Sequence, residues 1–153
     1  MTSIAIGQPA PAFELRNQAK ELVSLDDLKG RKTLIVFIPF PFTGICDAEG
    51  CAIRDGLSAL EAMDANVVVI TAHSIPTNAK WAAENSFEFP ILSDFWPHGE
   101  VIQAYGAFNA DLGVAMRSSF VIDADGIVRE IIATESLGIA REHQAQVEAL
   151  AAI

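Results

Sequence analysis

A run of six apolar or β-branched residues, Thr33–Ile38, is the clearest pattern in the sequence. It is bounded by Lys32 and Pro39 and shows no alternation of polar and apolar positions. A run of this kind is typical of a strand that is buried on both faces of a sheet. We therefore predict that residues 33–38 form the central strand, and residues 66–72 (NVVVITA) predict a second buried strand.

Residues 46–63 have the periodicity of a helix. Ile53, Leu57 and Leu60 recur three or four positions apart, which places them on one helical face. Between this helix and the preceding strand lies PFPFTGI, residues 39–45, whose prolines and glycine indicate a loop. The sequence thus predicts a strand, a loop and a helix in direct succession.

The rest of the chain alternates between shorter strands and helices. The predicted strands are 13–15, 21–23, 90–92, 119–123 and 127–133, and the predicted helices are a turn capped by Ser24, 76–84, a segment after Trp96-Pro97, and 141–152. Asp125-Gly126 is a favoured turn pair and predicts that the last two strands form a hairpin. This order predicts an α/β, thioredoxin-like fold with a mixed central sheet flanked by helices.

Composition and charge limit the classes of protein to which this chain can belong. A chain of 153 residues, 51% of them hydrophobic, is expected to fold as one domain spanning 1–153. Ten Lys and Arg against twenty Asp and Glu give a formal net charge of −10, which disfavours nucleic acid as a partner. The sequence shows neither a signal-peptide pattern nor an apolar run of membrane-spanning length, so we expect a cytoplasmic protein without a membrane partner.

The two cysteines are too few for a disulfide scaffold, so the role of each thiol has to be inferred from its position in the sequence. Cys46 falls where the predicted helix begins, directly after the loop that follows the strand 33–38. Unpaired N–H groups and the positive end of the helix dipole favour a thiolate there, which makes the thiol a nucleophile. The alternative is a buried, inert thiol, since free cysteine is among the most buried residue types.

The loop before Cys46 resembles the signature of the peroxiredoxin family, P-x-x-x-T-x-x-C, with Pro39, Thr43 and Cys46 in the matching places. The resemblance implies that Cys46 is the peroxidatic nucleophile and that Pro39 shields its sulfur from bulk water. It also implies that the Thr43 hydroxyl bonds to the thiolate and to the peroxide. Arg117 matches the family's distant arginine, whose guanidinium stabilises the thiolate and the leaving oxygen. The alternative for Arg117 is a solvated surface charge.

Longer stretches are similar to one subfamily, the AhpE-like one-cysteine alkyl hydroperoxide reductases. These stretches are FTGIC, FPILSDFWPHGEVIQAYGAFN and AMRSSFVID, and the opening GQPAPAFEL is typical of the whole family. Glu49 matches a glutamate that family members carry. By that resemblance it orients the site or a dimer contact, and the alternative is an ordinary acidic residue in the first helical turn.

Cys51 departs from the one-cysteine pattern. The spacing Cys46-x-x-x-x-Cys51 is similar to that of the PrxQ, or bacterioferritin comigratory protein, subfamily, in which the second thiol resolves the first. The resemblance therefore implies a Cys46–Cys51 disulfide after oxidation. The alternative is that Cys51 only packs against neighbouring residues.

These residues predict an antioxidant thiol peroxidase. Cys46 would reduce hydrogen peroxide and alkyl hydroperoxides, become a sulfenic acid, and be reset by a thiol reductant such as thioredoxin or a mycoredoxin. No nucleotide motif is present, and the three histidines are scattered, so we expect neither cofactor nor metal. The resemblance implies a homodimer or a higher homo-oligomer.

Two other functions compete with this prediction. A thioredoxin-type disulfide reductase needs C-x-x-C, which the spacing of Cys46 and Cys51 does not give. A peroxide-sensing switch or holdase would use Cys46 oxidation to act on a protein partner. Sustained peroxide turnover with a reducing system separates an enzyme from such a sensor.

Overall fold

Two apolar strands form the middle of the sheet in the computed structural model, which describes residues 4–153. Strand β3 (Lys32–Phe37) pairs in parallel with strand β4 (Ala65–Thr71) over all its residues. The side chains of Leu34, Ile35 and Phe37 are completely buried, as the apolar run predicted. Parallel strands of this composition require cover on both faces.

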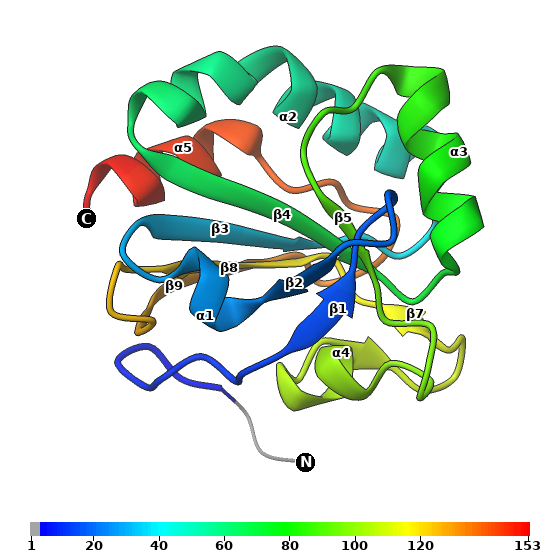
Figure 1. Cartoon of the computed structure of the whole chain (residues 1–153), viewed down its shortest axis with the longest axis horizontal. Coiled ribbons are helices and arrows are strands. Elements are labelled where there is room, and N and C mark those ends of the chain that lie inside the picture. The colour runs from blue at the N-terminus through cyan, green and yellow to red at the C-terminus, as the bar shows by residue number, and fades with distance from the viewer. Residues whose placement is uncertain (1–3) are drawn as a thin grey trace.

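The whole sheet has seven strands in the order β2-β1-β5-β4-β3-β8-β9 (Figure 1). The other strands are β1 (Glu14–Arg16), β2 (Leu22–Ser24), β5 (Ile91–Ser93), β8 (Ser118–Ile122) and β9 (Val128–Ala133). β5 is parallel to β4, whereas β1, β2, β8 and β9 pair in antiparallel fashion, so the sheet is mixed. The prediction that residues 33–38 form the central strand is wrong, because β4 occupies the middle position and β3 lies beside it.

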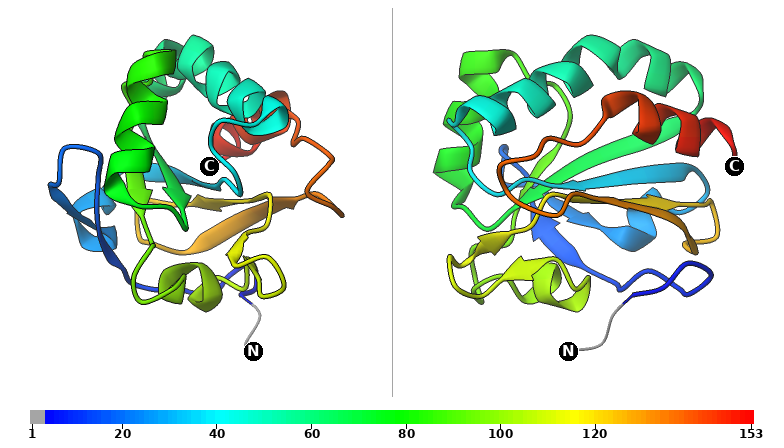
Figure 2. Two further views of the ribbon diagram at one scale, coloured as in Figure 1. Left: turned by 90° about the vertical axis from the view of Figure 1, so that its right-hand side faces the viewer. Right: turned by 180° about the vertical axis from the view of Figure 1, so that it is seen from behind.

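Helices cover both faces of this sheet (Figures 1 and 2). They are α1 (Leu25–Leu28), α2 (Gly44–Ala62), α3 (Ile75–Asn85), α4 (Glu100–Ala104) and α5 (His143–Ala151). Figure 2 shows α2, α3 and α5 on one face and α4 on the other. Ser24 caps α1 as predicted, in a reciprocal capping box with Asp27. Within residues 4–153, no helix is both long enough and apolar enough to cross a bilayer.

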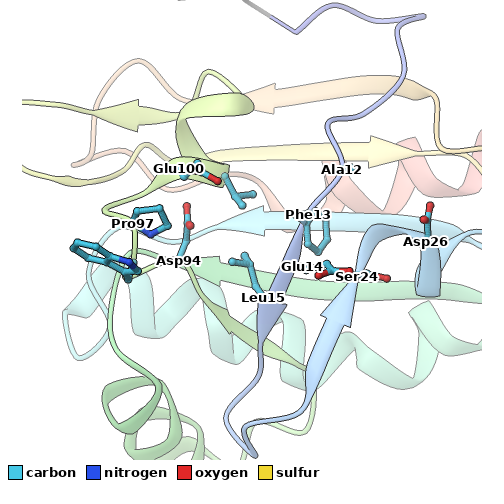
Figure 3. Close-up of a pocket in the computed structure, with 11 residues that line it drawn as sticks. Ala12, Phe13, Glu14, Leu15, Ser24, Asp26, Asp94, Pro97 and Glu100 are labelled. Carbon is cyan, nitrogen blue, oxygen red and sulfur yellow. The ribbon is translucent and has the colours of Figure 1, made fainter.

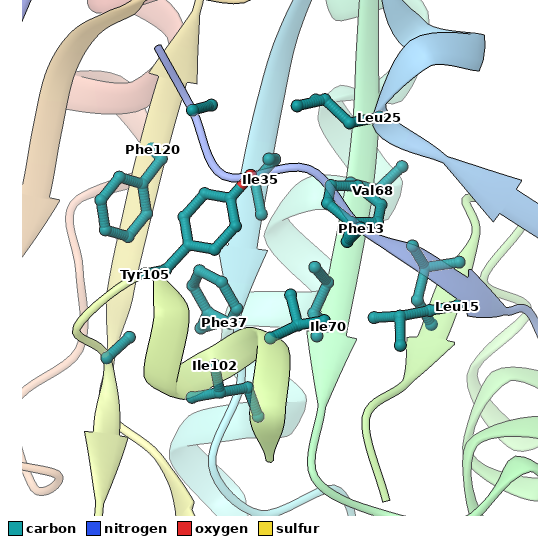
Figure 4. Packing of buried hydrophobic residues seen from close by; sticks show 14 of the residues in the cluster. Phe13, Leu15, Leu25, Ile35, Phe37, Val68, Ile70, Ile102, Tyr105 and Phe120 are labelled. Atoms are coloured by element: carbon teal, nitrogen blue, oxygen red, sulfur yellow. The ribbon is translucent and has the colours of Figure 1, made fainter. Parts of the chain in front are cut away.

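Alternating side chains of β3 and β4 divide the core into two clusters. Ile35 and Phe37 belong to the cluster on the α4 face, whereas Leu34 and Val36 belong to the cluster under α2, α3 and α5. On the α4 face, the ring of Tyr105 packs against Phe37 and Phe120, with centroid distances of 5.4 and 5.2 Å (Figure 4). Both faces of β3, the strand that leads into the active loop, are therefore packed against core residues.

The predicted elements agree with the observed ones to within two residues at each end. Two differences remain. A two-stranded hairpin, β6 (Phe108–Asn109) and β7 (Val114–Ala115), was not predicted. Helix α5 begins at His143, so Arg141 precedes the helix instead of opening it.

Candidate active site

Cys46 lies in the first turn of α2, where the strand, loop and helix pattern placed it. Thr43 is the N-cap residue of this helix and has extended backbone angles. The Cys46 side chain is fully buried, and its Sγ atom accepts a hydrogen bond from the Phe40 N–H at 3.4 Å. The sulfur thus lies at the N-terminal end of α2 with one backbone donor directed at it.

The loop residues of the signature surround this sulfur in different ways. Pro39 is buried, next to the end of β3. Thr43 is exposed, and its hydroxyl donates a hydrogen bond of 2.6 Å to the Phe40 carbonyl. Phe40 therefore binds Thr43 through its oxygen and Cys46 through its nitrogen. A direct bond from Thr43 to the thiolate or to a peroxide stays a prediction.

Arg117 reaches the site because β8 runs antiparallel to β3. Ser119 pairs with Val36, so the start of β8 lies beside the carboxyl end of β3, where the active loop leaves the sheet. The Arg117 side chain is only 4% exposed, which excludes a solvated surface charge. Its Nε donates to the Leu137 carbonyl at 2.7 Å, and its Nη1 donates to Glu49 Oε1 at 2.5 Å.

Glu49 binds two arginines, of which the sequence analysis identified one. Arg141 donates to Glu49 Oε2 from its backbone N and from Nε, both at 2.9 Å, and to Oε1 from Nη2 at 2.8 Å. Burial disfavours the charged carboxylate, but hydrogen bonds and the positive charges of Arg141 and Arg117 outweigh it and hold the pKa of Glu49 below its usual value. Glu49 is therefore not an ordinary solvated acid.

Arg141 also joins this cluster to the sheet and to α5. Its Nη1 donates to the Ser118 carbonyl at 2.8 Å and to Ser119 Oγ at 3.2 Å, and Ser119 in turn donates to Gln146. Nothing in the sequence distinguishes Arg141 from the other nine basic residues, because its partner Glu49 lies 92 positions away. The sequence placed Arg141 at the start of the predicted helix 141–152, which indicated no such contact.

Cys51 lies on the same helix, one turn beyond Cys46. Both thiols are free, and α2 is continuous from Gly44 to Ala62. Cys51 is half-buried against the core cluster under α2. With about 1.5 Å rise per residue on a radius of about 2.3 Å, Cα atoms five residues apart are roughly 8 to 9 Å apart, whereas a disulfide requires less than about 7 Å. The helical state therefore separates the two thiols.

Contacts with α3 hold this part of α2 in place. Asp47 Oδ1 accepts hydrogen bonds from Trp81 Nε1 at 2.7 Å and from the Phe42 N–H at 3.1 Å. One turn later, a Cβ atom on Gly50 would lie 2.6 Å from the ring of Phe87, so only glycine permits this close approach. Trp81 and Phe87 thus bracket the segment from Cys46 to Cys51.

A separate cavity of about 460 Å³ lies near the start of α4, and none of Pro39, Thr43, Cys46 or Arg117 lines it. Figure 3 shows the Asp94 carboxylate beside Glu100 and Pro97. Asp94 Oδ2 accepts a hydrogen bond from the Ile102 N–H at 2.8 Å, and burial raises the pKa of Asp94 to about 6.

Among residues 4–153, no three His, Cys, Asp or Glu side chains form a group that could hold a metal ion.

The AhpC/TSA family model matches residues 6–131, and the chain belongs to this family of peroxiredoxins. The family resemblance inferred from the active-loop motif is confirmed. Among curated proteins, "Alkyl hydroperoxide reductase E" of Mycobacterium tuberculosis and of Mycobacterium bovis are each 44% identical over 149 residues, which is 97% of both chains. "Putative peroxiredoxin bcp" of Haemophilus influenzae is 30% identical over 137 residues, covering 86% of this chain and 87% of that protein.

Solved structures agree with the predicted fold class. Peroxidoxin BcpB from Mycobacterium tuberculosis has a TM-score of 0.84 and 29% identity, covering 97% of this chain and 95% of its own. Enterococcus faecalis AhpC has a TM-score of 0.89 at 24% identity, covering 97% and 92%, which shows the fold alone. The thioredoxin-like α/β prediction is confirmed.

Proposed function

We propose that this protein is a thiol peroxidase that reduces hydrogen peroxide and alkyl hydroperoxides at Cys46. The observation that carries the proposal is a buried cysteine in the first turn of α2 with the Phe40 N–H directed at its sulfur. Membership of the AhpC/TSA family and the names of the curated relatives support the same reaction. The reaction requires only sulfur chemistry.

In the first step, the Cys46 thiolate attacks one peroxide oxygen and the O–O bond breaks. The other oxygen leaves with the bonding electron pair and takes up a proton as water or an alcohol, and Cys46 becomes a sulfenic acid. We assign stabilisation of the leaving oxygen to Thr43 and Arg117. The guanidinium is permanently charged, and its Nη2 group carries two further hydrogens in addition to those bonded to Leu137 and Glu49.

Glu49 and Arg141 would act on this step through Arg117. The Glu49 carboxylate and the Leu137 carbonyl fix the guanidinium at two of its donors. A donor that is held before the reaction needs no reorganisation in the transition state. Pro39 is buried and directly precedes Phe40, whose N–H binds the sulfur, and we assign to it the role of limiting access of water.

In the second step, Cys51 would attack the sulfenic acid, releasing water and forming a Cys46–Cys51 disulfide. Because the helical geometry separates the two thiols, the start of α2 must unwind first. A reductant of the thioredoxin, mycoredoxin or low-molecular-weight thiol class would then return both cysteines to the thiol form by exchange. If Cys51 only packs, the same reductants would act on Cys46 directly.

A cytoplasmic homodimer completes the proposal. Phe42, Phe95 and Trp96 are 44%, 53% and 70% exposed, and exposed large apolar residues support self-association. Two thiols kept free, instead of a disulfide scaffold, suit a reducing compartment.

The decisive experiment is peroxide consumption by the Cys46→Ser variant with an excess of dithiothreitol. The hydroxyl is nearly isosteric but a poor nucleophile, so we expect activity to vanish while the circular dichroism spectrum is kept. Cys51→Ser is the matched control and should consume peroxide, since dithiothreitol can reduce Cys46 directly. Consumption by Cys46→Ser at the wild-type rate would refute the proposed function.

A further inference from the structure

His73 contacts the loop that carries the nucleophile, although it lies outside the sequence motif. It follows β4, two residues after Thr71. Its ring atom Nε2 lies 3.0 Å from the carbonyl oxygen of Pro39. A carbonyl oxygen only accepts hydrogen bonds, so Nε2 carries the hydrogen and donates it.

The Pro39 carbonyl belongs to the same peptide unit as the Phe40 N–H. That N–H donates to Cys46 Sγ at 3.4 Å. This one peptide unit is therefore hydrogen-bonded at both ends, by His73 at its oxygen and by Cys46 at its hydrogen. An amide whose oxygen accepts a hydrogen bond is polarised, and its N–H becomes a stronger donor, by roughly 10–30% for each bond in a chain.

Further contacts fix His73 before any substrate arrives. Its backbone N–H donates to Thr71 Oγ1 at 3.1 Å, and its carbonyl accepts a hydrogen bond of 2.5 Å from Ser93 Oγ. The imidazole lies beside the Phe40 ring, with centroids 6.2 Å apart. Because β4, β5 and the active loop all hold it, the ring presents its Nε2 hydrogen to the Pro39 carbonyl in one orientation.

We propose that His73 is a positioning residue for Cys46. By donating to the Pro39 carbonyl, it orients and polarises the Phe40 N–H, which stabilises the attacking thiolate. The inference rests on the proposed function, since it assigns the thiolate the role of nucleophile. His73 transfers no proton in this scheme and acts only through the peptide unit between Pro39 and Phe40.

The test compares three substitutions in a Cys51→Ser background, where Cys46 is the one thiol in the chain. His73→Ala and His73→Phe both remove the donor, and the phenylalanine keeps a ring beside Phe40. His73→Gln places an amide N–H near the position of Nε2. We measure the rate of Cys46 alkylation by iodoacetamide at pH 7 and the second-order rate of oxidation by hydrogen peroxide in single turnover.

We expect both rates to fall about three- to tenfold in His73→Ala and His73→Phe, in line with the loss of one neutral hydrogen bond. His73→Gln should recover most of the loss, which a purely structural role of the ring would not produce. His98→Ala is the matched control, because that exposed imidazole packs on Trp96 and not on the active loop. It should react as the parent does.

Unchanged rates in His73→Phe, or equal losses in His73→Gln and His73→Ala, would overturn the inference. Circular dichroism identifies a variant that fails to fold. If His73→Ala does not fold, the comparison is made with His73→Phe. The proposed function fails separately, if the parent protein itself does not react with peroxide at Cys46. Alkylation by iodoacetamide needs no peroxide, so it tests His73 in either case.

Discussion

The hydrogen bond between Asp47 and Trp81 predicts how fast Cys46 can reach Cys51. Forming the disulfide requires the first turns of α2 to unwind, because an intact helix keeps the two Cα atoms roughly 8 to 9 Å apart. Unwinding must break the 2.7 Å bond from Trp81 Nε1 to the Asp47 carboxylate. Trp81 therefore stabilises the closed, peroxide-reactive helix against the open form that resolves.

The perturbation is Trp81→Phe, which removes the indole N–H and keeps an aromatic ring. Trp81 is fully buried and packs edge-on against Phe87, with centroids 5.0 Å apart, so the ring contributes to the core as well. A hydrogen bond to a charged group contributes about 1.5 to 3 kcal/mol. Asp47 is only half-buried and keeps its bond from the Phe42 N–H, so we take the lower value.

A loss of about 1.5 kcal/mol raises the population of the open helix roughly tenfold. If opening is a rapid equilibrium before the disulfide forms, the rate of disulfide formation rises by the same factor. The assay adds one equivalent of hydrogen peroxide and quenches samples with an alkylating agent. Mass spectrometry of non-reduced peptides then follows the Cys46–Cys51 disulfide, and excess peroxide measures the competing sulfinic acid at Cys46.

We expect faster disulfide formation and less sulfinic acid in Trp81→Phe. Trp96→Phe is the matched control, because the Trp96 side chain is 70% exposed and belongs to neither core cluster. A wild-type rate of disulfide formation in Trp81→Phe would refute the role of this bond. Persistent sulfenic acid with Cys51 still alkylatable, in every variant, would show that Cys51 only packs.

Three further predictions concern buried charges. Arg117→Ala should slow peroxide reduction about 10²- to 10³-fold in single-turnover kinetics, as for the loss of one oxyanion-type donor, and a wild-type rate would contradict its role. Arg141→Met should lower the free energy of unfolding in urea by about 3 kcal/mol, because buried Glu49 loses its bidentate partner; an unchanged midpoint would contradict this. Burial raises the pKa of Asp94 to about 6, whereas an aspartate in the unfolded chain has a pKa of roughly 4. The contribution of protonated Asp94 to the free energy of unfolding is therefore complete below about pH 4 and is lost as the pH rises through about 6. Asp94→Asn cannot ionise and should remove that loss, on the order of 3 kcal/mol between pH 4 and 7; parallel stability curves for the two proteins would refute it.

The sequence predicted those elements whose pattern is strong and local. β3 and β4 are continuous apolar runs, and α2 carries Ile53, Leu57 and Leu60 at helical spacing, so the local pattern indicates the type of each element. The β6–β7 hairpin was not predicted, because its strands have two residues each and no periodicity. The prediction of the central strand was wrong because the order of strands in a sheet depends on pairing between distant segments. A local pattern contains no information about that pairing.

The site residues also fall into those that a local motif identifies and those that only the fold brings together. Pro39, Thr43 and Cys46 lie within eight residues and were identifiable as one motif. Arg141 and His73 became visible only when the fold brought them to Glu49 and to the Pro39 carbonyl. The close approach of Phe87 to Gly50 is likewise a contact that no pattern along the chain contains.

The anchoring of Arg117 also bears on where this fold can be cut or fused. The family model ends at residue 131, yet the Leu137 carbonyl and the Arg141 side chain both lie beyond that boundary. A fragment that stops at the boundary would keep the motif, the nucleophile and the guanidinium, but would lose these supports of the guanidinium. An engineer who shortens this protein or inserts a partner between β9 and α5 therefore changes the active site without touching any residue of its signature.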